Sequence, residues 1–253
     1  MIIRLIGIGP GDPDQVTVQA VRALREVDYV VLTDKAAGAT DPLVAARERL
    51  LAHHLDQPPR LVVVADPSRD RTASGTSTPE GYARAVGDWH EARAAAYEKV
   101  LREHGGAPGF LVWGDPGFYD SSIRVLERVA HRIGADLDVI PGISSIQLLA
   151  ARHRIVLHDV GSAIHITTGR ELSAALASGQ RNVVVVLNRD LSALADPLLT
   201  DWQVWWGANL GTPHEALVAG RVGDVLACME AARRTTKEHA GWVMDTYLLR
   251  HPR

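Results

Sequence analysis

The sequence has a single cysteine, Cys228, among its 253 residues, so no disulfide can form within the chain. One free cysteine fits a reducing compartment such as the cytoplasm. No apolar run approaches the roughly 20 residues that a membrane-spanning helix needs. The first apolar stretch, residues 2–8, contains Arg4 and ends in a Gly/Pro turn, as a first β-strand does and a signal peptide does not. We therefore expect a cytoplasmic protein that does not bind membranes.

An excess of positive charge is also missing. Lysine and arginine number 27 against 30 aspartates and glutamates, and the net charge is -3, whereas nucleic-acid-binding proteins usually carry a basic excess or patch. No set of histidines and cysteines has zinc-ligand spacing, so we predict no metal. The chain has neither a G-x-S-x-G nucleophile turn nor a Walker phosphate loop. A nucleic-acid partner and these three kinds of site are therefore not expected.

The order of elements predicts the fold class. Hydrophobic residues make up 46% of the chain and charged residues 23%, the balance of a globular protein with a real core. Short apolar runs alternate with longer amphipathic segments, which indicates β-α units and mainly parallel sheets. Expected strands are residues 2–8, 29–32, 61–64, 110–113, 137–140, 164–167, 183–187, 204–206, 216–219 and 242–248. The clearest expected helices are 16–26, 83–103, 122–131, 143–153 and 225–237.

We expect two α/β domains, residues 1–141 and 142–253. The boundary is set near Pro141-Gly142, where the fifth expected strand ends. The first sheet should be parallel. The second should be mixed, because its last connections look too short for helical crossovers.

Three loops rich in glycine or serine follow the first, fourth and fifth expected strands. They are residues 7–13 (GIGPGDP), 113–120 (WGDPGFYD) and 141–145 (PGISS). Loops at the carboxyl ends of parallel strands are where open α/β sheets bind ligands, and glycine lets a ligand approach the main chain. Taken singly, each loop also reads as an ordinary turn, and Ser144 or Ser145 as a helix cap.

A dinucleotide site is one alternative for the first loop. Asp34 ends the second expected strand about where a ribose-binding acid would fall. However, Asp12 stands where the G-x-G-x-x-G pattern requires its third glycine, and two prolines interrupt the loop. A nicotinamide or flavin site is therefore disfavoured.

The order, spacing and position of the three loops together resemble the tetrapyrrole methylase family, from Ile2 to about Arg250. The resemblance implies two α/β domains with a cleft between them for S-adenosylmethionine. It is greatest to the deacetylating branch of the family, through residues 11–17, 88–90, 113–116, 151–155, 165–170 and 241–247. That branch implies C-methylation in cobalamin (vitamin B12) biosynthesis, converting precorrin-5 to precorrin-6A with release of acetate. Methylation of a different ring carbon, a dinucleotide-dependent oxidoreductase and a tetrapyrrole carrier remain alternatives.

The resemblance also implies site residues. The cofactor positions are Pro10, Trp113, Gly114, Asp115, Phe118, Ser144, Ser145, Leu187 and Gly211. Two of them depart from the family pattern: Trp113 replaces a glycine of some relatives and could crowd or stack on a ligand, and Leu187 stands where relatives often carry methionine. Asp34 matches a proton acceptor of some family members, with a strand-end turn or helix cap as the equal alternative. Relatives are commonly dimers, so a homodimer is expected.

The expected substrate carries many acetate and propionate arms, which call for cationic partners. Guanidinium binds carboxylate through two parallel hydrogen bonds. Arg170 is the preferred candidate, followed by Arg69, Arg71, Arg152 and Arg154, while Lys35 and Tyr119 are further candidates for substrate contact. The clustered Trp202, Trp205 and Trp206 could support a flat macrocycle, although core filling or a dimer interface is the commoner use of such rings.

Overall fold

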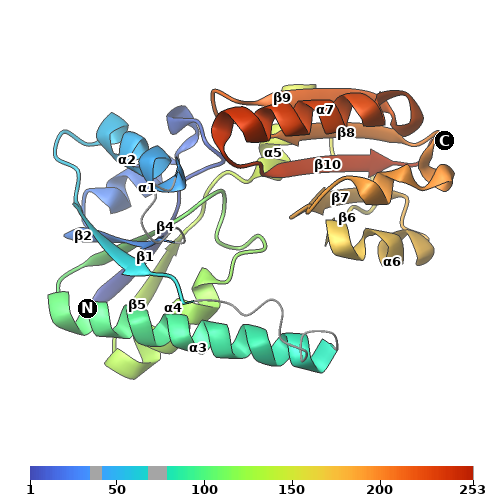
Figure 1. Cartoon of the computed structure of the whole chain (residues 1–253). Coiled ribbons are helices and arrows are strands. Elements are labelled where there is room, and N and C mark those ends of the chain that lie inside the picture. Colours follow the sequence, from blue (N-terminus) through green and yellow to red (C-terminus); the bar gives the residue numbers. More distant parts are fainter. Residues whose placement is uncertain (35–41, 68–78, 253) are drawn as a thin grey trace. The chain divides into compact units, whose positions relative to one another are not determined.

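The computed structural model describes residues 1–34, 42–67 and 79–252, which fall into two compact units (Figure 1). Unit 1 consists of Met1–Gly9 and Pro13–Ile143. Unit 2 consists of Ser144–Arg253 together with Pro10–Asp12. Among the described residues, no helix is both long enough and apolar enough to cross a membrane.

Unit 1 is built on a parallel sheet with the order β3-β2-β4-β1-β5. Its strands are β1 (Ile2–Gly7), β2 (Tyr29–Asp34), β3 (Arg60–Ala65), β4 (Pro108–Val112) and β5 (Asp136–Ile140). Its helices are the short η1 (Pro13–Gln15), α1 (Val18–Leu24), α2 (Pro42–His54), α3 (Pro79–His104) and α4 (Ser122–Ile133). All five residues of β4 are buried, as expected of a central parallel strand covered on both faces.

Helices cover both faces of this sheet (Figure 1). On one face α3 and α4 contribute Tyr97, Leu101 and Leu126 to a core with the strands. On the other face α1 and α2 contribute Leu24 and Leu51. Because every strand runs the same way, the carboxyl ends of β1, β4 and β5 share one edge, where the three loops begin.

Unit 2 is built on a mixed sheet with the order β6-β7-β10-β8-β9. Its strands are β6 (His165–Thr168), β7 (Asn182–Val186), β8 (Gln203–Ala208), β9 (Ala216–Arg221) and β10 (Asp245–Arg250). β6 and β7 are parallel, whereas β10 is antiparallel to β7 and β8, and β9 is antiparallel to β8. The helices are α5 (Ser145–His153), α6 (Leu172–Ala177), α7 (Val222–Ala240) and the short η3 (Gly169–Glu171), η4 (Ser192–Ala195) and η5 (Pro197–Leu199).

The expected fold class is confirmed: a parallel sheet precedes a mixed one, with helices between the strands. Most of the expected strand ends differ from the observed ones by one to three residues, and two of these differences have a clear structural cause. Leu187 lies outside β7 because its φ is +54°, which is not a strand conformation. β10 begins at Asp245 and not at residue 242, because the backbone of Met244 pairs with Asn209 in a turn.

The tryptophan cluster fills the core of unit 2. Trp206 is fully buried, and Trp202 and Trp205 are partly buried against apolar clusters on the two faces of the sheet. The guanidinium of Arg250 lies 5.2 Å from the centre of the Trp205 ring. These contacts support core filling as the use of these rings.

Candidate cofactor and substrate site

The three loops of unit 1 are joined by hydrogen bonds at the carboxyl edge of the sheet. The Gly9 amide donates to the Gly114 carbonyl (3.2 Å), and the Gly114 amide donates to the Gly9 carbonyl (2.8 Å). The Asp115 carboxylate accepts from Gly117 N at Oδ1 and from Gly142 N at Oδ2, each at 2.8 Å. Asp115 therefore ties the loop after β4 to the loop after β5.

Glycine is required where these loops meet. A Cβ on Gly142 would lie 2.1 Å from the Gly114 carbonyl oxygen, and a Cβ on Gly7 would lie 2.6 Å from Gly142 N. Gly114 itself has a φ of +76°, a left-handed conformation that side chains disfavour. Glycine at these positions therefore lets the backbones of the three loops pack directly against one another.

The side chains of the loop after β4 divide between core and surface. Trp113 is half-buried and packs on the apolar cluster beneath α1 and α2, so its ring supports the protein core. Phe118 and Tyr119 are about half exposed, at 45% and 47%. Tyr119 has a φ of +51°, an uncommon conformation for an aromatic residue. Of these three rings, those of Phe118 and Tyr119 are the more exposed.

Pro10 and Gly211 belong to elements that pack together in unit 2. A Cβ on Gly11 would lie 2.7 Å from Thr212 Cγ2 and 3.0 Å from the Leu210 carbonyl oxygen, so the segment Pro10–Asp12 lies directly on the Gly211 loop. Gly211 has a φ of +78°. Pro10 and Gly211 are 201 residues apart in the sequence, yet the loops that contain them are in contact.

An ion pair between Arg152 and Glu215 stabilises the Gly211 loop. The Gly211 amide donates to Glu215 Oε2 at 2.7 Å, and Arg152 Nε donates to Glu215 Oε1 at 2.8 Å. Arg152, a candidate for substrate binding, is thus committed to Glu215 in this structure. Arg154 ends α5 in a left-handed conformation (φ +54°) and acts there as its C-cap.

Asn209 is a structural residue of this loop that the sequence analysis missed. It is 2% exposed and has a φ of +45°. Its Oδ1 accepts from Met244 N at 2.8 Å, and its Nδ2 donates to the Trp242 carbonyl at 3.2 Å. An asparagine two residues before a glycine is a weak signal for such a turn, because asparagine tolerates positive φ.

The serine pair begins α5. Ser144 is buried and is the N-cap, with its amide donating to Gln147 Oε1 at 2.7 Å, while Ser145 is the first helical residue. The capping interpretation therefore holds for Ser144.

Leu187 and Arg170 follow the parallel pair β7 and β6, at one edge of the second sheet. Leu187 is 64% exposed. Arg170 lies in η3, its side chain is 65% exposed, and its Nε is 3.6 Å from Glu171 Oε1. Both residues therefore stand at the surface of the sheet edge from which ligand-binding loops usually project.

Asp34 is the last residue of β2 and lies opposite Ala65 of β3 at the carboxyl edge of the first sheet. The other candidates Lys35, Arg69 and Arg71 lie outside the described residues. Thr33, the residue before Asp34, is in contact with Arg93: the distance from Arg93 Nη2 to Thr33 Oγ1 is 3.5 Å. Arg93 is only 9% exposed. Arg93 also holds Asp66 through two hydrogen bonds, of 2.7 and 3.1 Å.

This arginine belongs to a buried cluster that the sequence analysis did not assign to the site. Its guanidinium lies 4.3 Å from the centre of the Trp89 ring. Burial raises the pKa of the neighbouring Tyr97 hydroxyl, and the charge of Arg93 opposes that rise. The cluster fixes the ends of β2 and β3 beside Asp34.

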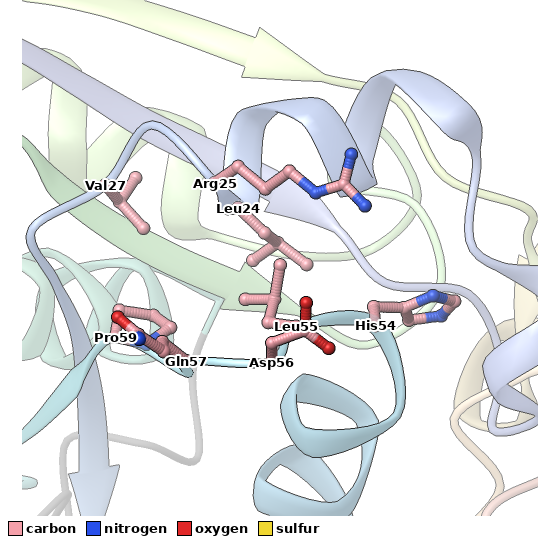
Figure 2. A pocket seen from close by; sticks show the side chains of 8 residues that line it. All are labelled: Leu24, Arg25, Val27, His54, Leu55, Asp56, Gln57 and Pro59. Carbon is pink, nitrogen blue, oxygen red and sulfur yellow. The ribbon is translucent and has the colours of Figure 1, made fainter.

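A cavity of about 410 Å³ lies elsewhere in unit 1, between the end of α1 and the chain that leads from α2 to β3 (Figure 2). Its lining residues are Leu24, Arg25, Val27, His54, Leu55, Asp56, Gln57 and Pro59. None of them is a candidate site residue. Within the described residues, no group of three or more His, Cys, Asp or Glu side chains is arranged to hold a metal ion.

Comparison with known proteins identifies the family. The tetrapyrrole (corrin/porphyrin) methylases match residues 3–226. The chain belongs to this family. The methylase is 40% identical over 255 residues to the precorrin-6A synthase [deacetylating] of Sinorhizobium sp., which covers 98% of this chain and 94% of that protein.

Two solved structures extend the comparison. A cobalamin-synthesis-related protein (CobF) from Corynebacterium diphtheriae is 36% identical, with a TM-score of 0.80 over 99% of this methylase and 98% of that chain. The uroporphyrin-III C-methyltransferase of Thermus thermophilus in complex with S-adenosylhomocysteine is 20% identical, with a TM-score of 0.57 over 98% of this chain and 92% of that one. At that identity the last likeness concerns the fold alone.

Proposed function

We propose that this methylase transfers the methyl group of S-adenosylmethionine to a ring carbon of precorrin-5 and that the reaction releases acetate. With water as the second co-reactant, the products are precorrin-6A, S-adenosylhomocysteine and acetate. The observation that carries the proposal is the 40% identity to the Sinorhizobium precorrin-6A synthase over 98% of this chain. The match of residues 3–226 to the methylase family supports the same reaction class.

The proposed cofactor site uses main chain more than side chains. Its residues are Pro10, Trp113, Gly114, Asp115, Phe118, Ser144, Ser145, Leu187 and Gly211. The glycines of these loops let their backbones pack against one another where a Cβ would clash, and this packing fixes the main chain that the cofactor is proposed to contact. When bound, this cofactor supplies a methyl carbon activated by a positively charged sulfur. Asp115 keeps the loops in place by accepting two backbone amides.

Positioning should supply most of the rate enhancement for methyl transfer. The ring carbon must be aligned with the methyl carbon in a site that excludes water. Release of the acetyl group adds a hydration or proton-transfer step, for which a general base is useful. We assign this role to Asp34, which the backbone places at the end of β2.

The proposed substrate contacts are Arg170, Lys35 and Tyr119. Arg170 is exposed, and its neighbour Glu171 is 3.6 Å away with a side chain that is also exposed. A pair of this kind is weak in water. The guanidinium can therefore exchange Glu171 for a carboxylate arm of the tetrapyrrole, which it can bind through two hydrogen bonds.

Mass spectrometry of the product tests the proposal. Purified protein is incubated with precorrin-5 and methyl-labelled S-adenosylmethionine, and free acetate is measured in the same reaction. We expect one labelled methyl group in the tetrapyrrole and one acetate for each turnover. Label transfer without acetate would favour a methylase that acts at another ring carbon. Absence of label transfer, in a protein that binds precorrin-5, would favour a carrier.

We also propose that the protein is a homodimer in the cytoplasm. Both proposals rest on the family resemblance. Light scattering of the purified protein tests for the homodimer, whose expected mass is twice the chain mass of 27.4 kDa. Fractionation of the producing cells tests the second.

A further inference from the structure

A single arginine of α7 holds the turn that follows β7. Arg233 Nη2 donates to the carbonyl oxygens of Asn188 (3.2 Å) and Arg189 (3.0 Å). The residue before them, Leu187, has a φ of +54° and is largely exposed. A branched side chain rarely adopts this conformation, so surrounding contacts must maintain it. The bonds from Arg233 to the next two carbonyls are such contacts.

Asp245 sets the orientation of Arg233. Arg233 Nε donates to Asp245 Oδ2 at 3.0 Å, and the side chains of Arg233 and Asp245 are 17% and 1% exposed. Trp206 Nε1 donates to the same oxygen, also at 3.0 Å. The guanidinium thus bonds to a carboxylate on one side and two carbonyls on the other, which its planar fork allows and a lysine ammonium cannot reproduce.

The same group of residues reaches the turn that follows β6. Asn188 Nδ2 donates to the Asp245 carbonyl at 3.2 Å, which fixes the Asn188 side chain. A Cβ on Gly169 would lie 2.6 Å from Asn188 Oδ1 and 3.3 Å from Asn188 Cα. The Asn188 side chain therefore packs directly on the backbone of Gly169, the residue before Arg170.

We infer that Arg233, Asp245 and Asn188 form a clamp that positions Leu187 for the cofactor and Arg170 for the substrate. They are positioning residues, because they act through the turns after β7 and β6 and none is among the residues assigned to ligand contact. The inference rests on the proposed function, which assigns Leu187 and Arg170 to the two ligands. All of the contacts lie within unit 2.

The first test replaces Arg233 by lysine, which keeps the charge and removes the fork. Calorimetry with S-adenosylhomocysteine compares the wild-type protein, Arg233→Lys and the control Arg234→Lys, which alters a neighbouring residue on α7. We expect the dissociation constant to rise about tenfold in Arg233→Lys because the Leu187 turn loosens, and to stay unchanged in the control. Thermal unfolding shows that each variant is folded.

The outcomes of this test separate the clamp from the proposed function. Wild-type affinity in folded Arg233→Lys would overturn the clamp and leave the proposed function intact. Lack of binding by the wild-type protein would instead contradict the proposed use of S-adenosylmethionine.

A second test does not depend on Arg233. Gly169→Ala should raise the KM for precorrin-5, because its Cβ would push against Asn188 Oδ1 and displace Arg170. Asn188→Gly removes that oxygen, so adding Gly169→Ala to Asn188→Gly should change the KM much less than it does in the wild-type background. Equal changes in the two backgrounds would show that the contact transmits nothing, and the inference would fail even if Arg233→Lys could not be purified.

Discussion

The carboxylate of Asp115 is hydrogen-bonded to the backbone amide of Gly142, at 2.8 Å, across two loops that are separate in sequence. Its other oxygen accepts the amide of Gly117 at the same distance. Both oxygens of the side chain are therefore used to shape the loops.

Asp115→Asn should weaken cofactor binding. An asparagine has one oxygen acceptor and can replace only one of the two bonds, and the lost bond should cost about 1 kcal/mol. The dissociation constant of S-adenosylhomocysteine, measured by calorimetry, should rise about fivefold. Asp120→Asn is the matched control, since Asp120 accepts a single amide, Ser122 N, and should change the affinity little. If wild-type protein and Asp115→Asn bound S-adenosylhomocysteine with equal affinity, Asp115 would have no part in the cofactor site.

Gly142→Ala should destabilise the protein, whereas Gly87→Ala should stabilise it. An added methyl at residue 142 would lie 2.1 Å from a carbonyl oxygen, and forced repacking costs about 1–3 kcal/mol. Gly87 is inside α3, and a methyl added there would have nothing within 4 Å, so alanine should gain about 0.5–1 kcal/mol. Urea unfolding of both variants measures the change in the free energy of unfolding, which should be negative for Gly142→Ala and positive for Gly87→Ala. A neutral Gly142→Ala would show that the loops can move apart.

Arg170→Ala should weaken binding of the tetrapyrrole and leave the affinity for S-adenosylhomocysteine nearly unchanged. Arg170→Lys should restore only part of the loss, because lysine lacks the two parallel donors. Glu171→Gln is the control, because it removes the charge beside Arg170 while keeping the guanidinium. Steady-state kinetics give the KM for precorrin-5. If Arg170→Ala weakened the binding of both ligands equally, the cause would be a folding defect.

Asp34→Asn should bind both ligands and turn over slowly if Asp34 is the general base. Loss of a general base lowers the rate by about 10²–10⁴-fold. Single-turnover reactions that follow methyl transfer and acetate release separately identify the affected step. If Asp34 serves only a turn at the strand end, asparagine should replace it almost fully, and both steps would run at the wild-type rate.

Tyr247 should make stability fall at alkaline pH. Burial raises the pKa of its hydroxyl far above the ordinary value of 10.0, and the charges of Asp245 and Asp190 raise it further. The unfolded state therefore loses this proton first as the pH rises, so the contribution is intact below about pH 10 and declines above it. Tyr247→Phe should show a shallower decline in the free energy of unfolding between pH 9 and about pH 11. Identical slopes would contradict the raised pKa.

Local patterns of the sequence were enough to predict the strands and the loops of the candidate site. Short apolar runs predicted the ten strands of the described residues to within three residues, because burial of strands imposes a hydrophobic pattern that can be read along the chain. The glycines of residues 7–11, 114 and 142 marked the places where backbone conformation and close approach exclude other side chains. The helices α2 and α6 were not among the clearest patterns, so no bounds were predicted for them.

The tertiary structure alone decided which residues work together. Trp113 packs into the core, Arg152 is held by Glu215, and Ser144 is the cap of α5. The pairing of Arg233 with Asp245 buries two charges side by side. Which partner each of these side chains meets depends on burial, on charge compensation and on contacts between residues far apart in sequence. Sequence periodicity reports which face of an element is apolar, but a single polar residue leaves no periodic trace of the partner that it meets after folding.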